Sequence, residues 1–154
     1  MSEIIEVYLH PGDVYASARP SIITTILGSC VAVCLCERGS AIGGVNHFLL
    51  AEQRAGDAPS SRYAPAAIDL LIKHVVALGA ARSRLTAKLF GGANVLRAFQ
   101  DDANHIGAAN VAVARSLLAQ QNIPIHAEDV GGTRGRRLTF AVHDGSASVR
   151  RLGP

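Results

Sequence analysis

The chain has 154 residues, of which 49% are hydrophobic and 18% are charged, and its formal net charge is +3. This length suits one domain with a sizeable core, and so high a hydrophobic content excludes a chain that is disordered throughout. No apolar run approaches the roughly 20 residues that span a bilayer, and the acidic start, residues 1–6, has no signal-peptide pattern. We therefore expect a single cytoplasmic domain over residues 1–154, without membrane insertion.

The first third of the chain predicts a strand, a tight corner and a second strand. Residues 3–9 alternate in polarity as a short strand does, and Pro11-Gly12 marks the turn that follows. A β-branched run over 22–27 stops at Gly28, and a second apolar run over 31–36 begins at once. The corner between these runs is Gly28-Ser29-Cys30. The next apolar run, 41–50, is predicted to return beside it as a hairpin strand.

The middle of the chain contains one polar segment and one amphipathic helix. Residues 51–62 are small and polar, and we expect a mobile loop that gates or contacts a partner, with an ordinary surface linker as the alternative. Apolar residues at helical spacing predict a helix over 63–78, with Gly79 as its C-terminal cap. A strand over 85–90 leads into Gly91-Gly92, and 95–99 is predicted to be helical.

The last third alternates one helix with short strands. A long helix is predicted over 105–121, followed by strands over 123–127, 137–142 and 147–152, the last two joined by an Asp-Gly turn. About seven strands in sequence runs, with two or three helices, indicate an α+β fold. The arginines near the C-terminus are accompanied by one aromatic residue, Phe140, so we expect solvated charges and no nucleic-acid partner.

The corner cysteine is the candidate nucleophile. A corner leaves the sulfur of Cys30 accessible on one side, and the backbone N–H groups of Gly28 and Ser29 nearby are suited to hold an oxyanion. His47 lies where the return strand reaches the corner, and a neighbouring imidazole can take a thiol proton. Thr24 has the same parity along the chain as Cys30, and we expect its hydroxyl to orient the imidazole.

Two other chemistries compete for these residues. Cys30, Cys34 and Cys36 share parity and, with His47, would form a zinc set. However, structural zinc cysteines usually come in pairs on loops, so we expect no metal and interpret Cys34 and Cys36 as core thiols. Glu128-Asp129 is a possible acid–base pair, but a turn whose carboxylates accept backbone N–H groups or pair with Arg134 is the favoured interpretation.

Several motifs, in order, resemble one family over nearly the whole chain. The chain is similar to the chemoreceptor glutamine deamidases, the CheD family of bacterial chemotaxis, in six stretches, which are 24–33 (TTILGSCVAV), 43–50 (GGVNHFLL), 62–64 (RYA), 88–94 (KLFGGAN), 106–110 (IGAAN) and 127–136 (AEDVGGTRGR). The family's catalytic cysteine, histidine and threonine correspond to Cys30, His47 and Thr24.

The resemblance implies both a fold and a reaction. It implies a β-sandwich-like core flanked by helices, with Gly91 and Gly92 in a close-approach turn near the site. It also implies a protein-glutamine deamidase, with receptor methyl esters as further substrates and with no metal or organic cofactor. Chemoreceptors are the implied partners, and a CheC-family phosphatase is a second one. The alternative function is a non-catalytic regulator that binds receptors or this phosphatase.

Overall fold

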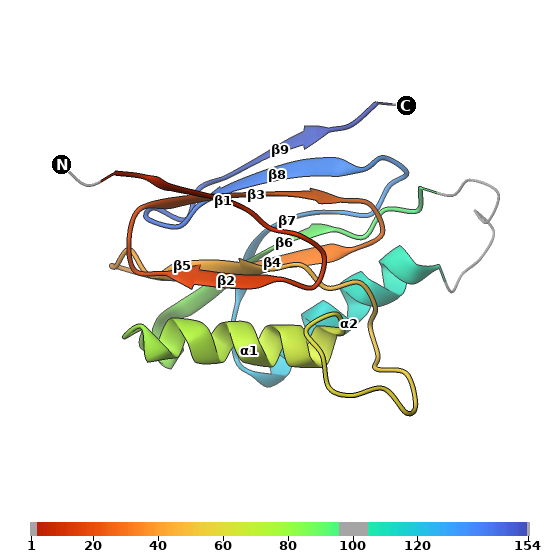
Figure 1. Cartoon of the computed structure of the whole chain (residues 1–154), viewed down its shortest axis with the longest axis horizontal. Coiled ribbons are helices and arrows are strands. Elements are labelled where there is room, and N and C mark those ends of the chain that lie inside the picture. The colour runs from red at the N-terminus through yellow and green to blue at the C-terminus, as the bar shows by residue number, and fades with distance from the viewer. Residues whose placement is uncertain (1–2, 96–104, 154) are drawn as a thin grey trace.

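A computed structural model describes residues 3–95 and 105–153 and has three layers, with two sheets stacked face to face and two helices beneath them (Figure 1). The outer sheet has the strand order β1-β3-β8-β9 and comprises β1 (Ile5–Tyr8), β3 (Ser21–Leu27), β8 (Arg136–Ala141) and β9 (Ala147–Arg151). The central sheet has the order β2-β5-β4-β6-β7 and comprises β2 (Val14–Ser17), β5 (Gly43–Asn46), β4 (Val31–Glu37), β6 (Leu85–Gly91) and β7 (Ile125–Val130).

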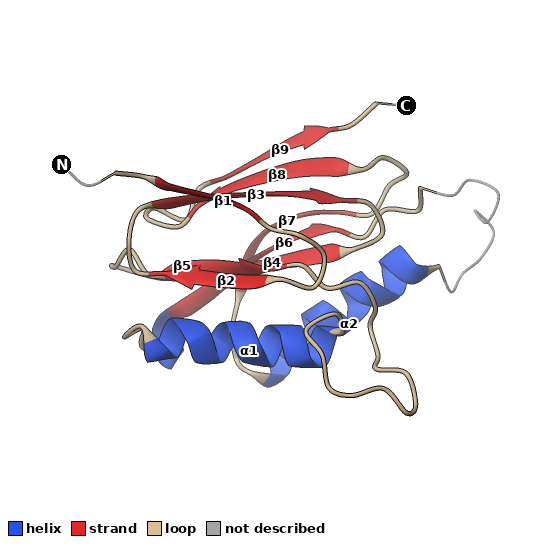
Figure 2. Ribbon diagram, viewed as in Figure 1, coloured by secondary structure: helices blue, strands red, loops and turns tan. Residues whose placement is uncertain are grey.

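Both helices cover the same face of the central sheet (Figure 2). Helix α1 (Ala64–Ala77) lies under β2, β5 and β4, and α2 (Ile106–Gln120) lies under β4, β6 and β7. One apolar cluster fills the space between the sheets, and a larger one fills the space between the central sheet and the helices. The central sheet is therefore buried on both faces.

The burial patterns of β3 and β4 follow from these layers. In β3 the odd-numbered side chains are buried and the even-numbered ones are partly or fully exposed, because one face of the outer sheet is open to solvent. In β4 the side chains from Val31 to Leu35 are all buried, because both faces of the central sheet are covered. The chain passes from one sheet to the other at the Gly28-Ser29-Cys30 corner.

The α+β sandwich expected from the sequence is confirmed, with differences in its parts. The described residues contain nine strands, and the additional β2 lies in a segment for which the sequence predicted no strand. Its four residues obtain a strand conformation from pairing with β5, which no local pattern reveals. The predicted strand over 41–50 is regular over Gly43–Asn46 alone, and most of the helix predicted over 95–99 lies outside the described residues.

Helix α1 forms where its pattern predicted. Pro65 occupies the first turn, where its missing N–H costs nothing, and Gly79 has a φ of 114°, as expected for a residue that ends a helix. In the described part of the chain, no helix is long and apolar enough to cross a membrane.

Candidate active site

The corner that carries Cys30 is held by a pair of glycines at the end of β6. The Gly92 N–H donates to the Cys30 carbonyl at 2.9 Å, and the Ala93 N–H donates to the Gly28 carbonyl at 2.9 Å. Gly91 has a φ of 106°, and a Cβ added to it would lie 2.2 Å from the Cys30 oxygen. Gly91 and Gly92 therefore shape the corner by close backbone approach. The Gly92 N–H is occupied by this contact.

A short antiparallel bridge brings His47 to the same side of the sheet as Cys30. Val31 and Phe48 pair through two backbone hydrogen bonds, of 3.2 and 3.0 Å. Both side chains contact the helix-side core. Because side chains alternate along extended backbone, Cys30 and His47 lie on the opposite face, toward the outer sheet, as diagonal neighbours across the bridge. The register of this bridge thus places the predicted nucleophile and base on the same face, and His47 Nε2 is buried there without a hydrogen-bond partner among the described residues.

The imidazole of His47 is bonded to Thr25. Its Nδ1 lies 2.7 Å from the Thr25 hydroxyl oxygen, and both side chains are buried. The same hydroxyl donates to the Leu9 carbonyl at 2.7 Å. A hydroxyl has one proton to donate, so Thr25 accepts from the protonated Nδ1 of His47. The unprotonated nitrogen is therefore Nε2, the atom that a general base needs free.

The expectation that Thr24 orients the imidazole is wrong in this geometry. Odd-numbered side chains of β3 point between the sheets, so Thr25 points inward and Thr24 points outward. In β4 the even-numbered Ala32 and Cys34, together with Cys30, belong to the core between the sheets. The corner shifts the parity because it joins strands of different sheets, and the parity argument from Cys30 fails for that reason.

Burial keeps both members of the pair uncharged. It lowers the pKa of His47 from 6.5 to about 4, an effect that the Asp13 carboxylate partly opposes. Burial also raises the pKa of the Cys30 thiol, against the smaller opposite effect of its own backbone N–H. The resting site therefore contains an uncharged thiol and a neutral imidazole.

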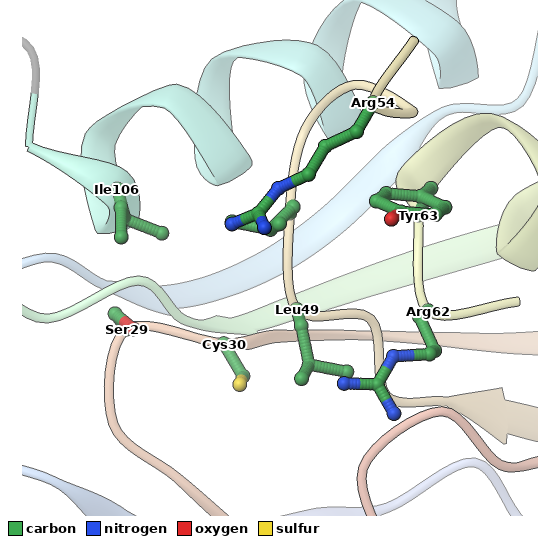
Figure 3. A pocket seen from close by; sticks show the side chains of 8 residues that line it. Ser29, Cys30, Leu49, Arg54, Arg62, Tyr63 and Ile106 are labelled. Atoms are coloured by element: carbon green, nitrogen blue, oxygen red, sulfur yellow. The ribbon is translucent and has the colours of Figure 1, made fainter. Parts of the chain in front are cut away.

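A pocket of about 320 Å³ opens onto Cys30 (Figure 3). It is lined by Ser29, Cys30, Leu49, Leu50, Arg54, Arg62, Tyr63 and Ile106. Leu49 follows the His47 segment, and its N–H donates to the Arg62 carbonyl at 2.8 Å. The 51–62 segment thus supplies one wall of the pocket, next to the strand that carries His47. A carboxamide side chain is small enough to enter and reach the sulfur.

Comparison with known proteins identifies the family. The family model described as CheD chemotactic sensory transduction matches residues 49–151. The chain belongs to the CheD family. A relative in Anaeromyxobacter dehalogenans (strain 2CP-C), named probable chemoreceptor glutamine deamidase CheD 1, is 47% identical over 147 residues, which are 96% of this chain and 85% of the relative.

Two further CheD relatives differ in length. The probable chemoreceptor glutamine deamidase CheD of Sulfurimonas denitrificans (strain ATCC 33889 / DSM 1251) is 38% identical over 93% of this chain and 92% of its own. The protein of the same name from Stenotrophomonas maltophilia (strain K279a) is 46% identical over 84% of this chain, and the match spans 65% of that relative.

Asn110 is a site residue that the sequence reasoning did not single out. Its side-chain amide, on α2, donates to the Ser29 and Leu49 carbonyls, both at 2.9 Å, and the residue is fully buried. It thereby ties the nucleophile corner to the segment that carries His47. A signal was present in the sequence, because an asparagine on the apolar stripe of a helix needs buried partners.

The other candidate residues of this CheD chain lie elsewhere. Cys34 is buried and its pKa is raised well above the usual value, first by burial. Glu128 and Asp129 belong to β7 and not to a turn. Glu128 pairs with Arg115 at 2.7 Å, and Asp129 pairs with Arg136 and Arg151 at 2.9 and 3.0 Å. Arg134 donates instead to a backbone carbonyl. Within the described ranges, no three His, Cys, Asp or Glu side chains gather as metal ligands do.

Proposed function

We propose that this CheD-family chain is a protein-glutamine deamidase that acts on chemoreceptors, with Cys30 as nucleophile, His47 as base and Thr25 as the residue that orients His47. The observation that carries the proposal is the Thr25–His47 hydrogen bond of 2.7 Å, which leaves Nε2 as the free base on the same side of the sheet as Cys30. The names of the relatives, probable chemoreceptor glutamine deamidases, support the choice of substrate.

The first half of the reaction forms a thioester. His47 Nε2 takes the thiol proton as the sulfur of Cys30 attacks the side-chain carbonyl carbon of glutamine. The tetrahedral intermediate collapses, the C–N bond breaks, and the imidazolium returns its proton to the nitrogen, which leaves as ammonia. A neutral resting pair suits this route, because the proton that His47 takes from the thiol is the same proton that it then gives to the leaving nitrogen.

The oxyanion of the intermediate needs a hydrogen-bond donor near the sulfur. The Cys30 N–H lies close enough to its own thiol to lower the thiol pKa. Among the described residues, neither this N–H nor that of Ser29 donates to a backbone carbonyl. These two N–H groups are our candidates for the oxyanion site. Gly28, Gly91 and Gly92 shape the corner, as their backbone contacts indicate.

The second half hydrolyses the thioester. His47 takes a proton from water as the water oxygen attacks the thioester carbon. The C–S bond then breaks, the imidazolium returns its proton to the Cys30 sulfur, and the new carboxylic acid loses its proton to solvent as glutamate. The sum is glutamine plus water giving glutamate plus ammonia. A glutamate methyl ester enters the same scheme with methanol as the leaving group. Every step is carried by the chain's own groups and water.

Mass spectrometry tests the proposal directly. The purified protein is incubated with the cytoplasmic helical region of a chemoreceptor, and glutamine-to-glutamate conversion is mapped by peptide. We expect conversion at specific glutamines and none with Cys30→Ala. Cys36→Ala is the matched control, because it removes a half-buried thiol in β4 away from the pocket. Deamidation by Cys30→Ala, or none by the intact protein with a reactive Cys30, contradicts the proposal.

Partners and location complete the proposal. Receptor modification requires access to the cytoplasmic part of the receptor, so we place the protein in the cytoplasm. Binding to a CheC-family phosphatase stays a prediction, which co-purification with such a phosphatase tests. The alternative, a regulator that binds without catalysis, is separated from the enzyme by the mass-spectrometric assay above.

A further inference from the structure

Two arginines stand at the pocket beside the reactive cysteine, and the mechanism uses neither. Arg54 and Arg62 are the charged side chains among the described residues that line the pocket. The other lining residues, Cys30 included, are uncharged at neutral pH. Neither arginine takes part in the ion pairs found among the described residues.

The two arginines approach the pocket from different places. Arg54 belongs to the segment between β5 and α1, and Figure 3 shows its side chain extending across the pocket toward the side where Ile106 lies. Arg62 lies at the base of that segment, and Figure 3 shows its guanidinium group beside Leu49. Ile106, on the α2 side, is half exposed and apolar. Both positive charges therefore come from the 51–62 segment, and the Arg54 guanidinium reaches over the pocket.

Arg62 is held in this position by several contacts. Its carbonyl accepts from the N–H groups of Leu49 and Leu50, at 2.8 and 3.3 Å. The stem of its side chain packs near Gly12, whose N–H donates to the His47 carbonyl. The Arg62 guanidinium is thus carried by the same backbone network that positions the catalytic histidine, and it remains exposed to solvent.

The Asp57 carboxylate belongs to the same segment as Arg54 and Arg62, and it is already engaged. Asp57 accepts a hydrogen bond from the Tyr63 hydroxyl, and its backbone N–H closes a turn with the Arg54 carbonyl. Asp57 does not line the pocket. Two guanidinium groups therefore face the space above Cys30 with no described carboxylate within ion-pairing distance.

A glutamine side chain carries no charge, so its carboxamide cannot form an ion pair with Arg54 or Arg62, which we call the arginine rim. We propose that Arg54 and Arg62 determine specificity by binding an acidic side chain that neighbours the target glutamine in the substrate segment. The inference rests on the proposed deamidase function and adds the substrate's local chemistry to it. Guanidinium groups suit this role because they bind carboxylates in a fixed, two-pronged geometry.

The test compares two forms of one receptor fragment. A glutamine that the fragment assay shows to be converted is chosen, and the acidic residues within one helical turn of it are either kept or changed to alanine. We expect the acidic form to have a kcat/KM about threefold or more above that of the neutral form, the range of an ion pair at an exposed rim. The ratio should fall at high salt.

Arginine variants test whether Arg54 and Arg62 cause the preference for the acidic form. Arg62→Gln and Arg54→Gln should each bring the ratio toward one, by lowering kcat/KM for the acidic form more than for the neutral form. Arg150→Gln, an exposed arginine on β9, removes the same charge far from the pocket and should change nothing. Arg62→Glu should reverse the preference, so that a fragment with lysine in place of the acidic neighbour has a higher kcat/KM than the acidic form.

The possible failures are distinguishable. If the intact protein converts no receptor glutamine, the proposed function fails. If it converts both forms with equal kcat/KM, or converts natural sites that have no carboxylate within one turn, the function stands and the specificity inference is wrong. If the arginine variants lower kcat/KM equally for both forms, the arginines act on the reacting group itself, which also overturns the inference.

Discussion

At the scale of single residues, the Thr25 hydroxyl sets the tautomer of His47, the base of the proposed mechanism. Thr25→Ala removes the acceptor for His47 Nδ1–H, so the imidazole loses both its tautomer and its orientation. We expect kcat to fall at least about tenfold, part of the 10²- to 10⁴-fold that a positioned base contributes. Thr25→Ser should recover much of the activity, because it keeps the oxygen. Deamidation of the receptor fragment provides the rates.

Thr24→Ala is the matched control for that change. It makes the same substitution one residue away, on the outward face of β3, and should leave kcat near the wild-type value. A large loss of kcat in Thr24→Ala, with little loss in Thr25→Ala, would contradict the Thr25–His47 contact and favour Thr24 as the orienting residue.

The depressed pKa of His47 predicts an unusual pH profile. A general base must be unprotonated, and burial keeps His47 in that form above about pH 4. We expect kcat/KM for the receptor fragment to stay level as the pH is lowered through 6.5, the ordinary value for histidine, and to fall only near pH 4. A half-loss of kcat/KM near the ordinary value would show that the imidazole is solvated in the working enzyme.

At the scale of elements, the glycine pair at the end of β6 acts as a support for the corner. Gly91→Ala adds a Cβ that would overlap the Cys30 carbonyl, at a backbone angle that already favours glycine. We expect loss of activity and a fall in unfolding free energy above the 1–2 kcal/mol or so of backbone strain alone. Urea unfolding and the deamidation assay measure the two effects.

Gly131→Ala separates strain from overlap. Gly131 also has a positive φ, of 81°, but nothing lies within 4 Å of the place that an added Cβ would occupy. This variant should show the strain cost and keep most of its activity. Equal losses of unfolding free energy and activity in Gly91→Ala and Gly131→Ala would mean that the corner tolerates the added Cβ, and that Gly91 is not needed to support it.

Helix α2 contributes to the site through a single polar side chain. Asn110→Ala leaves the Ser29 and Leu49 carbonyls without their buried donor, and we expect a loss of about 1–3 kcal/mol in unfolding free energy together with reduced kcat. Gln120→Ala, on an exposed position of the same helix, should affect neither quantity. An unchanged kcat in a destabilised Asn110→Ala would limit the role of the asparagine to folding.

Local patterns in the sequence could predict much of this fold. The amphipathic α1, the paired apolar runs of β3 and β4, and the corner with Cys30 all follow from spacing and turn residues. Strand β2 could not be predicted, because four residues of mixed polarity become a strand only through β5. The choice of Thr25 over Thr24 could not be predicted either, because it depends on which sheet each strand joins.

At the scale of the whole molecule, stability should depend on pH through His47. In the unfolded chain the imidazole titrates near 6.5 and in the folded chain near 4, so the unfolded state binds the extra proton between these values. Unfolding free energy should therefore be fully retained above pH 6.5 and decline on acidification, by about 1.4 kcal/mol per pH unit in this window.

Urea titrations across that pH range measure the effect. In His47→Gln the part of the slope due to this group should disappear, whereas His126→Gln, which changes an exposed histidine, should leave it in place. An unchanged slope in His47→Gln would show that other groups cause the acid sensitivity.

The crossing of the chain between the two sheets at Gly28-Ser29-Cys30 has a consequence for the cell. Thr25 belongs to the outer sheet, whereas Cys30 and His47 lie at the ends of β4 and β5, two inner strands of the central sheet, so Thr25 reaches His47 only when the layers are packed. A copy that is damaged or still folding carries the cysteine but lacks the assembled set. We therefore expect copies with unpacked layers to be inactive toward exposed glutamines of other proteins, because their His47 lacks the Thr25 acceptor.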